Sequence, residues 1–131
     1  MSTSTTLTLL RPSDQTFADE NFVWEAIVDG GMVCVTIKEY LLAAGLLPVV
    51  SELLVRLPSG FPDAAPDMFW FASPVTRADG GVIPATELIE TYLDRPWQRW
   101  SRHIGSQWRP GVDDLRSYMA YVSACIRVAA Q

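Results

Sequence analysis

The spacing of apolar residues predicts a helix near each end of the chain. Between Val112 and Ala130, apolar side chains recur at three- and four-residue intervals, which places them on one face of an α-helix. Asp113 and Asp114 are expected in its first turn, where carboxylates favour the positive end of the helix dipole. Pro12-Ser13-Asp14 is a helix-start signal and predicts a short first helix that ends near Asn21.

Four apolar runs between these helices predict an antiparallel meander. Trp24 to Val28 and Met32 to Ile37 flank Asp29-Gly30-Gly31, and Asp-Gly between β-branched runs is the strongest local signal for a β-hairpin. Glu52 to Leu57 and Met68 to Phe71 predict the third and fourth strands, because a proline stops each run.

The other segments carry weaker patterns. Residues 1–6 are expected to form a flexible tail, and residues 7–10 an edge strand or a lead-in to the first helix. Residues 41–50 read as a strand end followed by a loop, and Pro84 to Leu93 as one or two helical turns. The order of helix, four-stranded meander, loop-rich segment and helix predicts an α+β fold. The C-terminal helix is expected to pack on the sheet, in a single domain over residues 1–131.

Composition narrows the class of protein. The 131 residues are 49% hydrophobic and 19% charged, enough to bury one core. The net charge of -5 argues against a general nucleic-acid binder, which needs a basic footprint. No apolar run is long enough to cross a membrane and no secretion signal opens the chain, so a cytoplasmic protein without membrane partners is expected. One histidine and two cysteines without metal-ligand spacing predict no metal site.

The segment from Asp94 to His103 differs in composition from the rest of the chain. Four of the ten basic residues fall between Arg95 and Arg109, together with three of the five tryptophans: Trp97, Trp100 and Trp108. Tryptophan and arginine are enriched at interface hot spots, so the segment as a unit favours a docking or active-site loop. For the individual tryptophans, the alternative of core anchors with arginines stacked on them is favoured.

The loop that joins the third and fourth strands carries a family resemblance. Leu57-Pro58-Ser59-Gly60-Phe61-Pro62-Asp63, followed by Pro66, resembles the corresponding connection in ubiquitin-conjugating enzymes. Trp108-Arg109-Pro110 resembles the entry to the helix that follows the catalytic cysteine of those enzymes. With the Trp-Gln-Arg-Trp-Ser-Arg-His run, the pattern resembles the bacterial branch called prokaryotic ubiquitin-conjugating family E, over about Trp24 to Val122.

The chain departs from that family at the reacting position. Trp100 stands where the family's cysteine is expected, and Ser73-Pro74-Val75 stands where a His-Pro-Asn triplet is expected. Cys34 and Cys125 lie elsewhere, in a strand and in the last helix, where they are expected to be packing residues. The resemblance therefore does not transfer a thioester to this chain.

Ser101 is the candidate replacement for the missing cysteine. His103 lies two residues on and points the same way in an extended loop, so it could serve as the base that a serine nucleophile needs. Arg102 or Arg99 could stabilise the acyl oxyanion. The alternative is that Ser101 and His103 only satisfy backbone groups in a tight loop.

Two functions follow from the resemblance. The first is a carrier that accepts the C-terminus of a ubiquitin-like or multi-ubiquitin protein from an activating enzyme, as an oxyester on Ser101. The resemblance also implies a JAB-type metalloprotease in the same pathway, and no cofactor, because the activating enzyme uses the ATP. The second is a catalytically inactive module that docks the ubiquitin-like protein or the activating enzyme. The residues expected to contact a partner are Trp97, Arg99, Trp100, Trp108, Phe61 and Pro62. Single-stranded nucleic-acid binding through the same segment is disfavoured by the acidic charge.

Overall fold

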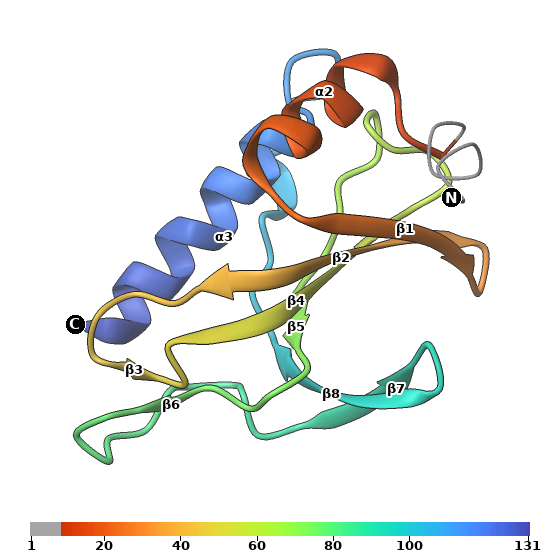
Figure 1. Ribbon diagram of the computed structural model, residues 1–131. Coiled ribbons are helices and arrows are strands. Elements are labelled where there is room, and N and C mark those ends of the chain that lie inside the picture. The colour runs from red at the N-terminus through yellow and green to blue at the C-terminus, as the bar shows by residue number, and fades with distance from the viewer. Residues whose placement is uncertain (1–8) are drawn as a thin grey trace.

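The computed structural model describes residues 9–131, in which helices α2 and α3 lie beside a curled main sheet (Figure 1). The tail predicted over residues 1–6, like residues 7 and 8, lies outside the described part. The elements are α2 (Pro12–Asn21), β1 (Trp24–Asp29), β2 (Met32–Leu41), β3 (Leu46–Leu47), β4 (Val50–Leu57), β5 (Phe69–Phe71), β6 (Thr76–Arg77), β7 (Ile89–Tyr92), β8 (Arg95–Trp100), a 3-10 turn (Gly105–Gln107) and α3 (Leu115–Ala130). The α+β class is confirmed.

The predicted meander is present and is longer than expected. The main sheet has six strands in the order β1-β2-β4-β5-β8-β7, of which the first four are the predicted strands. All neighbouring strands in it are antiparallel. Within residues 41–50, β2 ends at Leu41 and the two-residue strand β3 pairs with β6 in a separate small sheet.

The hairpin of β7 and β8 corrects two expectations. Pro84 to Leu93 forms no helix and instead contains strand β7, and residues 95–100 of the Arg-Trp segment form a strand rather than a loop. The hairpin turn uses Leu93 and Asp94 with φ of 55° and 60°. Two successive residues with positive φ are the signature of a type I′ turn, which is usually recognised from asparagine and glycine. Leu-Asp gives no such signal.

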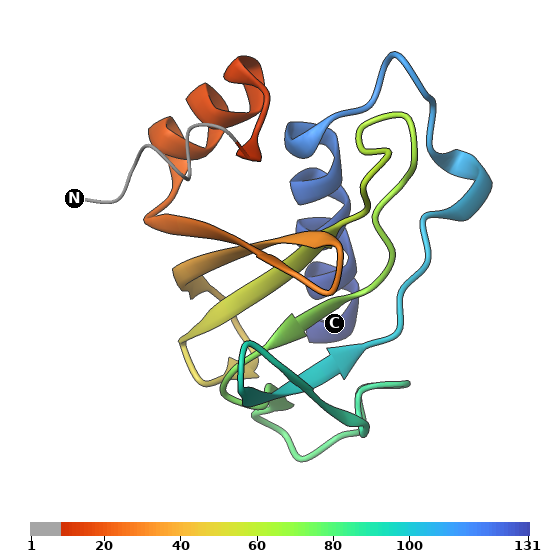
Figure 2. The ribbon, with the colours of Figure 1, turned by 90° about the vertical axis from the view of Figure 1, so that its right-hand side faces the viewer.

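Helix α3 covers one face of the sheet (Figure 2). Its stripe of Leu115, Tyr118, Met119, Val122 and Ile126 is buried, as the periodicity predicts. A second, smaller cluster on Cys34, Leu54, Trp70 and Trp97 packs against Tyr92 and Leu93 of the β7–β8 hairpin. Cys34 is therefore a packing residue, as expected.

The start of α3 differs from the prediction by three residues. Asp114 is the N-cap, with its side chain accepting from the Ser117 N–H and the Ser117 hydroxyl accepting from the Asp114 N–H. Asp113 lies before the helix and accepts a hydrogen bond from the Arg109 N–H. That bond lowers the pKa of Asp113, and burial opposes it. Asp113 thus closes the turn before the helix and Asp114 caps the helix, so neither carboxylate lies in the first helical turn, contrary to the prediction.

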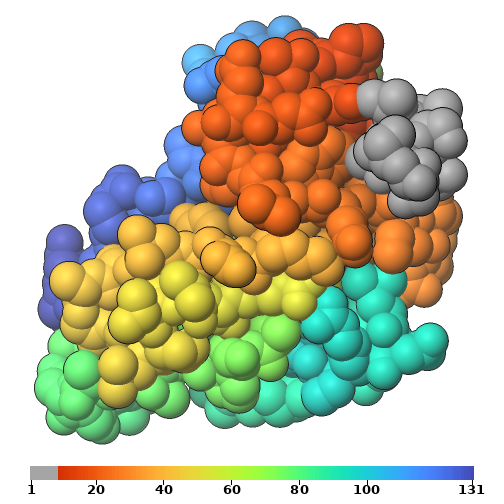
Figure 3. All heavy atoms as spheres, in the orientation of Figure 1, coloured from red at the N-terminus to blue at the C-terminus, as the bar shows by residue number. Residues whose placement is uncertain are grey.

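Several apolar side chains remain exposed around β3. Leu41, Leu47, Val49 and Val50 are exposed, and their segment lies on the surface between the blue C-terminal end of α3 and the green segment around β6 (Figure 3). Gly45 has a φ of +97°, and a Cβ there would lie 3.3 Å from the Ala130 carbonyl oxygen. Glycine is therefore needed where this segment passes the end of α3.

Candidate functional site

The two segments that carry the family resemblance lie side by side (Figure 2). The indole N–H of Trp108 donates to the carbonyl of Pro62 at 2.8 Å, and its ring lies 6.0 Å from that of Phe61. Trp108 is only 6% exposed and also packs edge-on against Tyr118 of α3. Trp108 thus holds the loop after β4 against the loop before α3. Phe61 and Pro62, which it contacts, are termed the rim of the site.

Two of the expected partner contacts are not available to a partner. Trp97 and Trp100 are each 0% exposed. Trp100 stacks on Phe69 at 5.5 Å, and the Trp97 indole donates to the carbonyl of Tyr92. Because both side chains are enclosed in the two packed faces of the sheet, the expectation that they line a docking surface is corrected. They fix the strand from which residues 101–103 emerge.

The backbone bends locally at Ser101. The Arg102 N–H donates to the Trp100 carbonyl at 3.0 Å, which is the bond of a γ-turn centred on Ser101. Two bonds to other loops hold this turn: the Ser101 N–H donates to the Ala85 carbonyl, and the Arg102 carbonyl accepts from the Met68 N–H. The turn breaks the alternation of side chains that would aim residues 101 and 103 in the same direction.

The structure therefore gives Ser101 and His103 different partners. The Ser101 hydroxyl accepts a hydrogen bond from Arg99 Nε at 3.1 Å, and Arg99 also donates to Glu90 at 2.9 Å. His103 Nδ1 lies 2.6 Å from Asp67 Oδ1. The expectation that the imidazole reaches the Ser101 hydroxyl is corrected, and the side chain that contacts the hydroxyl is Arg99.

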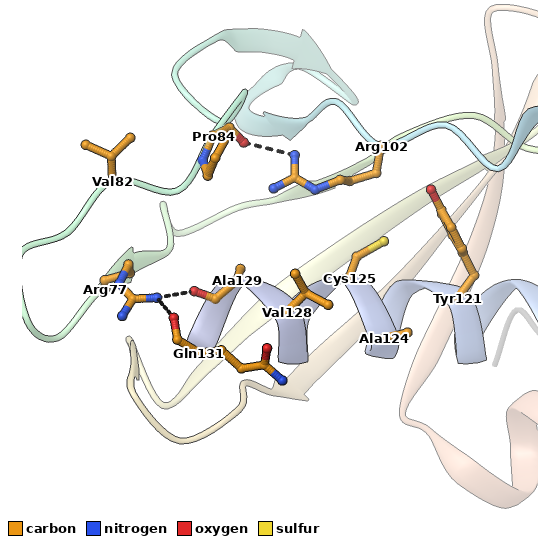
Figure 4. A pocket seen from close by; sticks show the side chains of 10 residues that line it. All are labelled: Arg77, Val82, Pro84, Arg102, Tyr121, Ala124, Cys125, Val128, Ala129 and Gln131. Carbon is orange, nitrogen blue, oxygen red and sulfur yellow. Dashed lines mark hydrogen bonds between the residues drawn. The ribbon is translucent and has the colours of Figure 1, made fainter.

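Arg102 extends over a pocket beside α3 and contacts the backbone carbonyl of Ser101 at 3.3 Å, not its hydroxyl. Its guanidinium donates to the Pro84 carbonyl at 2.9 Å and lies 5.1 Å from the centre of the Trp100 ring. The pocket has a volume of about 580 Å³ and is lined by the last turns of α3, the segment after β6 and Arg102 (Figure 4). Within the part of the chain that the structure describes, no carboxylate lies within ion-pair distance of Arg102.

Cys125 and Tyr121 line the same pocket, and the Cys125 sulfur faces Arg102 (Figure 4). Burial raises the pKa of the Cys125 thiol, while a hydrogen bond with Tyr121 and the Arg102 charge lower it. Burial also raises the pKa of Tyr121, to about 12. Because the net shift of Cys125 is upward, its thiol is protonated at neutral pH and is a poor nucleophile.

Metal chemistry has no preformed site among residues 9–131, where no three His, Cys, Asp or Glu side chains gather closely enough to hold an ion. None of the described helices has the length and apolar character of a membrane span.

Comparison with known proteins identifies the family. A family model described as prokaryotic E2 family E matches residues 10–129, nearly the whole chain. This chain belongs to prokaryotic E2 family E. No curated protein and no solved structure matches it. The ubiquitin-conjugating-like fold that the sequence suggested is thereby confirmed for a family E chain that has no cysteine between Arg95 and Asp114.

The fold brings two residues to the site that the sequence did not single out, Asp67 and Tyr121, together with Cys125, which was expected only to pack in the last helix. Asp67 meets His103, and Tyr121 and Cys125 meet Arg102 across the pocket. Asp67 lies in the proline-rich loop, where it resembles any solvated turn residue, and Tyr121 and Cys125 follow the helical period of α3. Only the packing of α3 against the turn of residues 100–103 reveals them.

Proposed function

We propose that this chain is a carrier in a prokaryotic ubiquitin-like conjugation pathway, and that it accepts the C-terminus of the ubiquitin-like protein as an oxyester on Ser101. Membership of prokaryotic E2 family E supports the pathway. The observation that supports Ser101 is the hydrogen bond from Arg99 Nε to its oxygen. A guanidinium that donates to the hydroxyl oxygen stabilises the negative charge that develops there during attack.

The acyl transfer into the site balances without a cofactor. Ser101 Oγ forms a bond to the terminal carbonyl carbon of the ubiquitin-like protein, and the carbon–sulfur bond to the activating enzyme's thiol breaks. The hydroxyl proton passes to the departing sulfur. Arg99 stays in place throughout, because Glu90 holds its other end at 2.9 Å.

The rim of the site offers the surface on which the partner would dock. Phe61 and Pro62 are partly exposed beside Trp108, on the loop that the family resemblance identified. Arg99 and Ser101 are also partly exposed on the adjoining strand end. In the proposal, Phe61 and Pro62 contact the ubiquitin-like protein or the activating enzyme, and the buried Trp108 holds their loop in place.

The test is adduct formation with the cognate activating enzyme, the ubiquitin-like protein and ATP, followed on a gel without reductant. The proposal predicts an adduct that resists thiols, is released by hydroxylamine or mild base, and disappears in Ser101→Ala. Ser106→Ala is the matched control, because Ser106 is an exposed serine on the same connection. An adduct that thiols release, and that Cys125→Ala or Cys34→Ala removes, would contradict the serine ester.

A second candidate function is a docking module without covalent chemistry. The observation that favours it is that His103 contacts Asp67 and leaves Ser101 without a base in hydrogen-bonding contact. Binding of the ubiquitin-like protein or the activating enzyme, measured by calorimetry and accompanied by no adduct of any kind, would establish this function in place of the carrier.

A further inference from the structure

The contact between Asp67 and His103 is built by two antiparallel stretches of backbone. The Met68 N–H donates to the Arg102 carbonyl at 3.0 Å, and Phe69 pairs with Trp100 in the adjoining strands. Asp67 and His103 are the next residues outward from that bonded pair. Their side chains therefore meet because the β5–β8 pairing continues past the end of the regular sheet.

Met68 is held in an unusual conformation at this point. Its φ is +63°, in the left-handed region that non-glycine residues rarely adopt. Both of its backbone groups are fixed, because its carbonyl accepts a hydrogen bond from the Tyr118 hydroxyl of α3 at 2.7 Å. Local strain that the surrounding structure maintains in this way is characteristic of functional sites.

Stability alone does not explain the pair. The side chains of His103 and Asp67 are 60% and 58% exposed, and ion pairs with such exposure contribute little to folding. The arrangement does have a chemical consequence. An ionised carboxylate can only accept a hydrogen bond, so the contact places the proton of the neutral imidazole on Nδ1 and leaves the lone pair on Nε2.

We propose that Asp67 is a positioning residue that fixes His103 as the Nδ1–H tautomer, so that Nε2 accepts the proton of the amine that takes the acyl group from Ser101. The identity of the reaction rests on the proposed carrier function. The amine nitrogen bonds to the carbonyl carbon and the ester bond to Ser101 Oγ breaks. Nε2 takes the proton that the amine loses, and water returns a proton to the serine oxygen.

Arg99 and His103 have different contacts, which fits their different proposed roles. Arg99 contacts the Ser101 oxygen, which changes charge when the ester forms and breaks. His103 contacts Asp67 and is largely exposed to solvent, from which an acceptor amine would arrive. Asp67 then stabilises the imidazolium that forms when Nε2 is protonated.

The first test measures the tautomer directly on the free chain. His103 is the only histidine, so the two imidazole nitrogen resonances in a 15N-labelled sample need no assignment to a residue, and their couplings to the carbon-bound ring protons distinguish Nδ1 from Nε2. At a pH where the ring is neutral, the proposal predicts the Nδ1–H pattern in the wild type and a change to the Nε2–H form, which free histidine prefers, in Asp67→Ala. Asp63→Ala is the control, because Asp63 is an exposed carboxylate in the same loop. A wild-type ring in the Nε2–H form, or an unchanged ring in Asp67→Ala, would overturn the proposal.

The second test measures transfer out of the site. Purified Ser101 conjugate is mixed with free lysine, and loss of the conjugate is followed in a single turnover. His103→Gln and Asp67→Ala are expected to slow the discharge about 10-fold or more, and Asp63→Ala to leave it unchanged. Equal rates in all four proteins overturn the proposal even if the tautomer is as predicted. If no conjugate forms, the carrier function fails, and the tautomer measurement alone decides whether Asp67 positions the ring.

Discussion

The carboxylate of Asp14 in helix α2 accepts a hydrogen bond from the backbone N–H of Leu115, the first residue of helix α3, at 3.2 Å. Asp14 is only 2% exposed, and its other oxygen accepts from Arg11. Helix N-termini leave N–H groups without partners inside the helix, and a carboxylate satisfies them and favours the dipole. The first helix therefore fixes the start of the helix that walls the site.

Removing this carboxylate is expected to destabilise the fold. Asp14→Ala should lower the free energy of unfolding by about 1–2 kcal/mol, as loss of a helix cap does. Urea denaturation followed by tryptophan fluorescence measures the change. Glu20→Ala, an exposed carboxylate on the same helix, should change the free energy by less than about 0.5 kcal/mol. Equal midpoints for the Asp14 and Glu20 variants would contradict the role of Asp14.

Glu52 should make the free energy of unfolding depend on pH in the acidic range. Hydrogen bonds from Arg95 lower the pKa of Glu52, burial opposes them, and Lys38 adds to the lowering. The unfolded carboxyl therefore takes up protons at a higher pH than the folded one. The stability that Glu52 contributes is present above its unfolded pKa and is lost as the pH falls through the folded pKa.

The wild type should consequently lose more unfolding free energy than Glu52→Gln between neutral pH and about pH 3. Urea denaturation at the two pH values measures this difference. Arg95→Gln, which removes the largest cause of the shift, should also flatten the dependence. A Glu52→Gln variant with the same acid sensitivity as the wild type would contradict the assignment.

Trp97 is expected to contribute to stability and not to partner affinity. Trp97→Phe removes the hydrogen bond to the Tyr92 carbonyl and leaves a space in the second cluster. A loss of about 1–3 kcal/mol in unfolding free energy is expected. Phe61→Ala, on the partly exposed rim, should instead weaken partner binding in calorimetry. Weaker partner binding by a folded Trp97→Phe variant would contradict this prediction and would indicate that Trp97 contacts the partner directly.

Cys125 should react slowly with alkylating reagents at neutral pH. Burial raises the pKa of its thiol, and the Arg102 charge partly offsets that effect. Alkylation by iodoacetamide, followed peptide by peptide in a mass spectrometer, should accelerate with pH and should be slower still in Arg102→Gln, because the thiolate then loses its nearby cation. Faster alkylation in Arg102→Gln would show that the arginine shields the thiol rather than stabilising the thiolate.

Elements that are determined by residues close together in the sequence could be predicted from it. The proline at the start of α2, Asp-Gly between β1 and β2, and the helical period of α3 each specify their element locally. The β7–β8 hairpin was missed because Leu93 and Asp94 adopt positive φ without a glycine to indicate it.

The site itself depends on pairs that are distant in the chain. Asp67 and His103 are 36 positions apart, and Asp14 and Leu115 are 101 apart. The γ-turn that separates Ser101 from His103 is likewise held by the Met68 N–H, from the loop before β5. No spacing along a single sequence encodes such contacts, so candidate residues could be named from the sequence but their contact partners could not.

The most direct measurement is the location of the acyl group in the adduct. Trypsin cleaves after Arg99 and Arg102, so the released peptide Trp100-Ser101-Arg102 holds a single hydroxyl group and no cysteine. Digestion at mildly acidic pH followed by tandem mass spectrometry should show this peptide carrying the C-terminal remnant of the ubiquitin-like protein. A remnant on a peptide that contains Cys34 or Cys125, or an unmodified chain after exposure to a working activating enzyme, would show that Ser101 is not the acceptor.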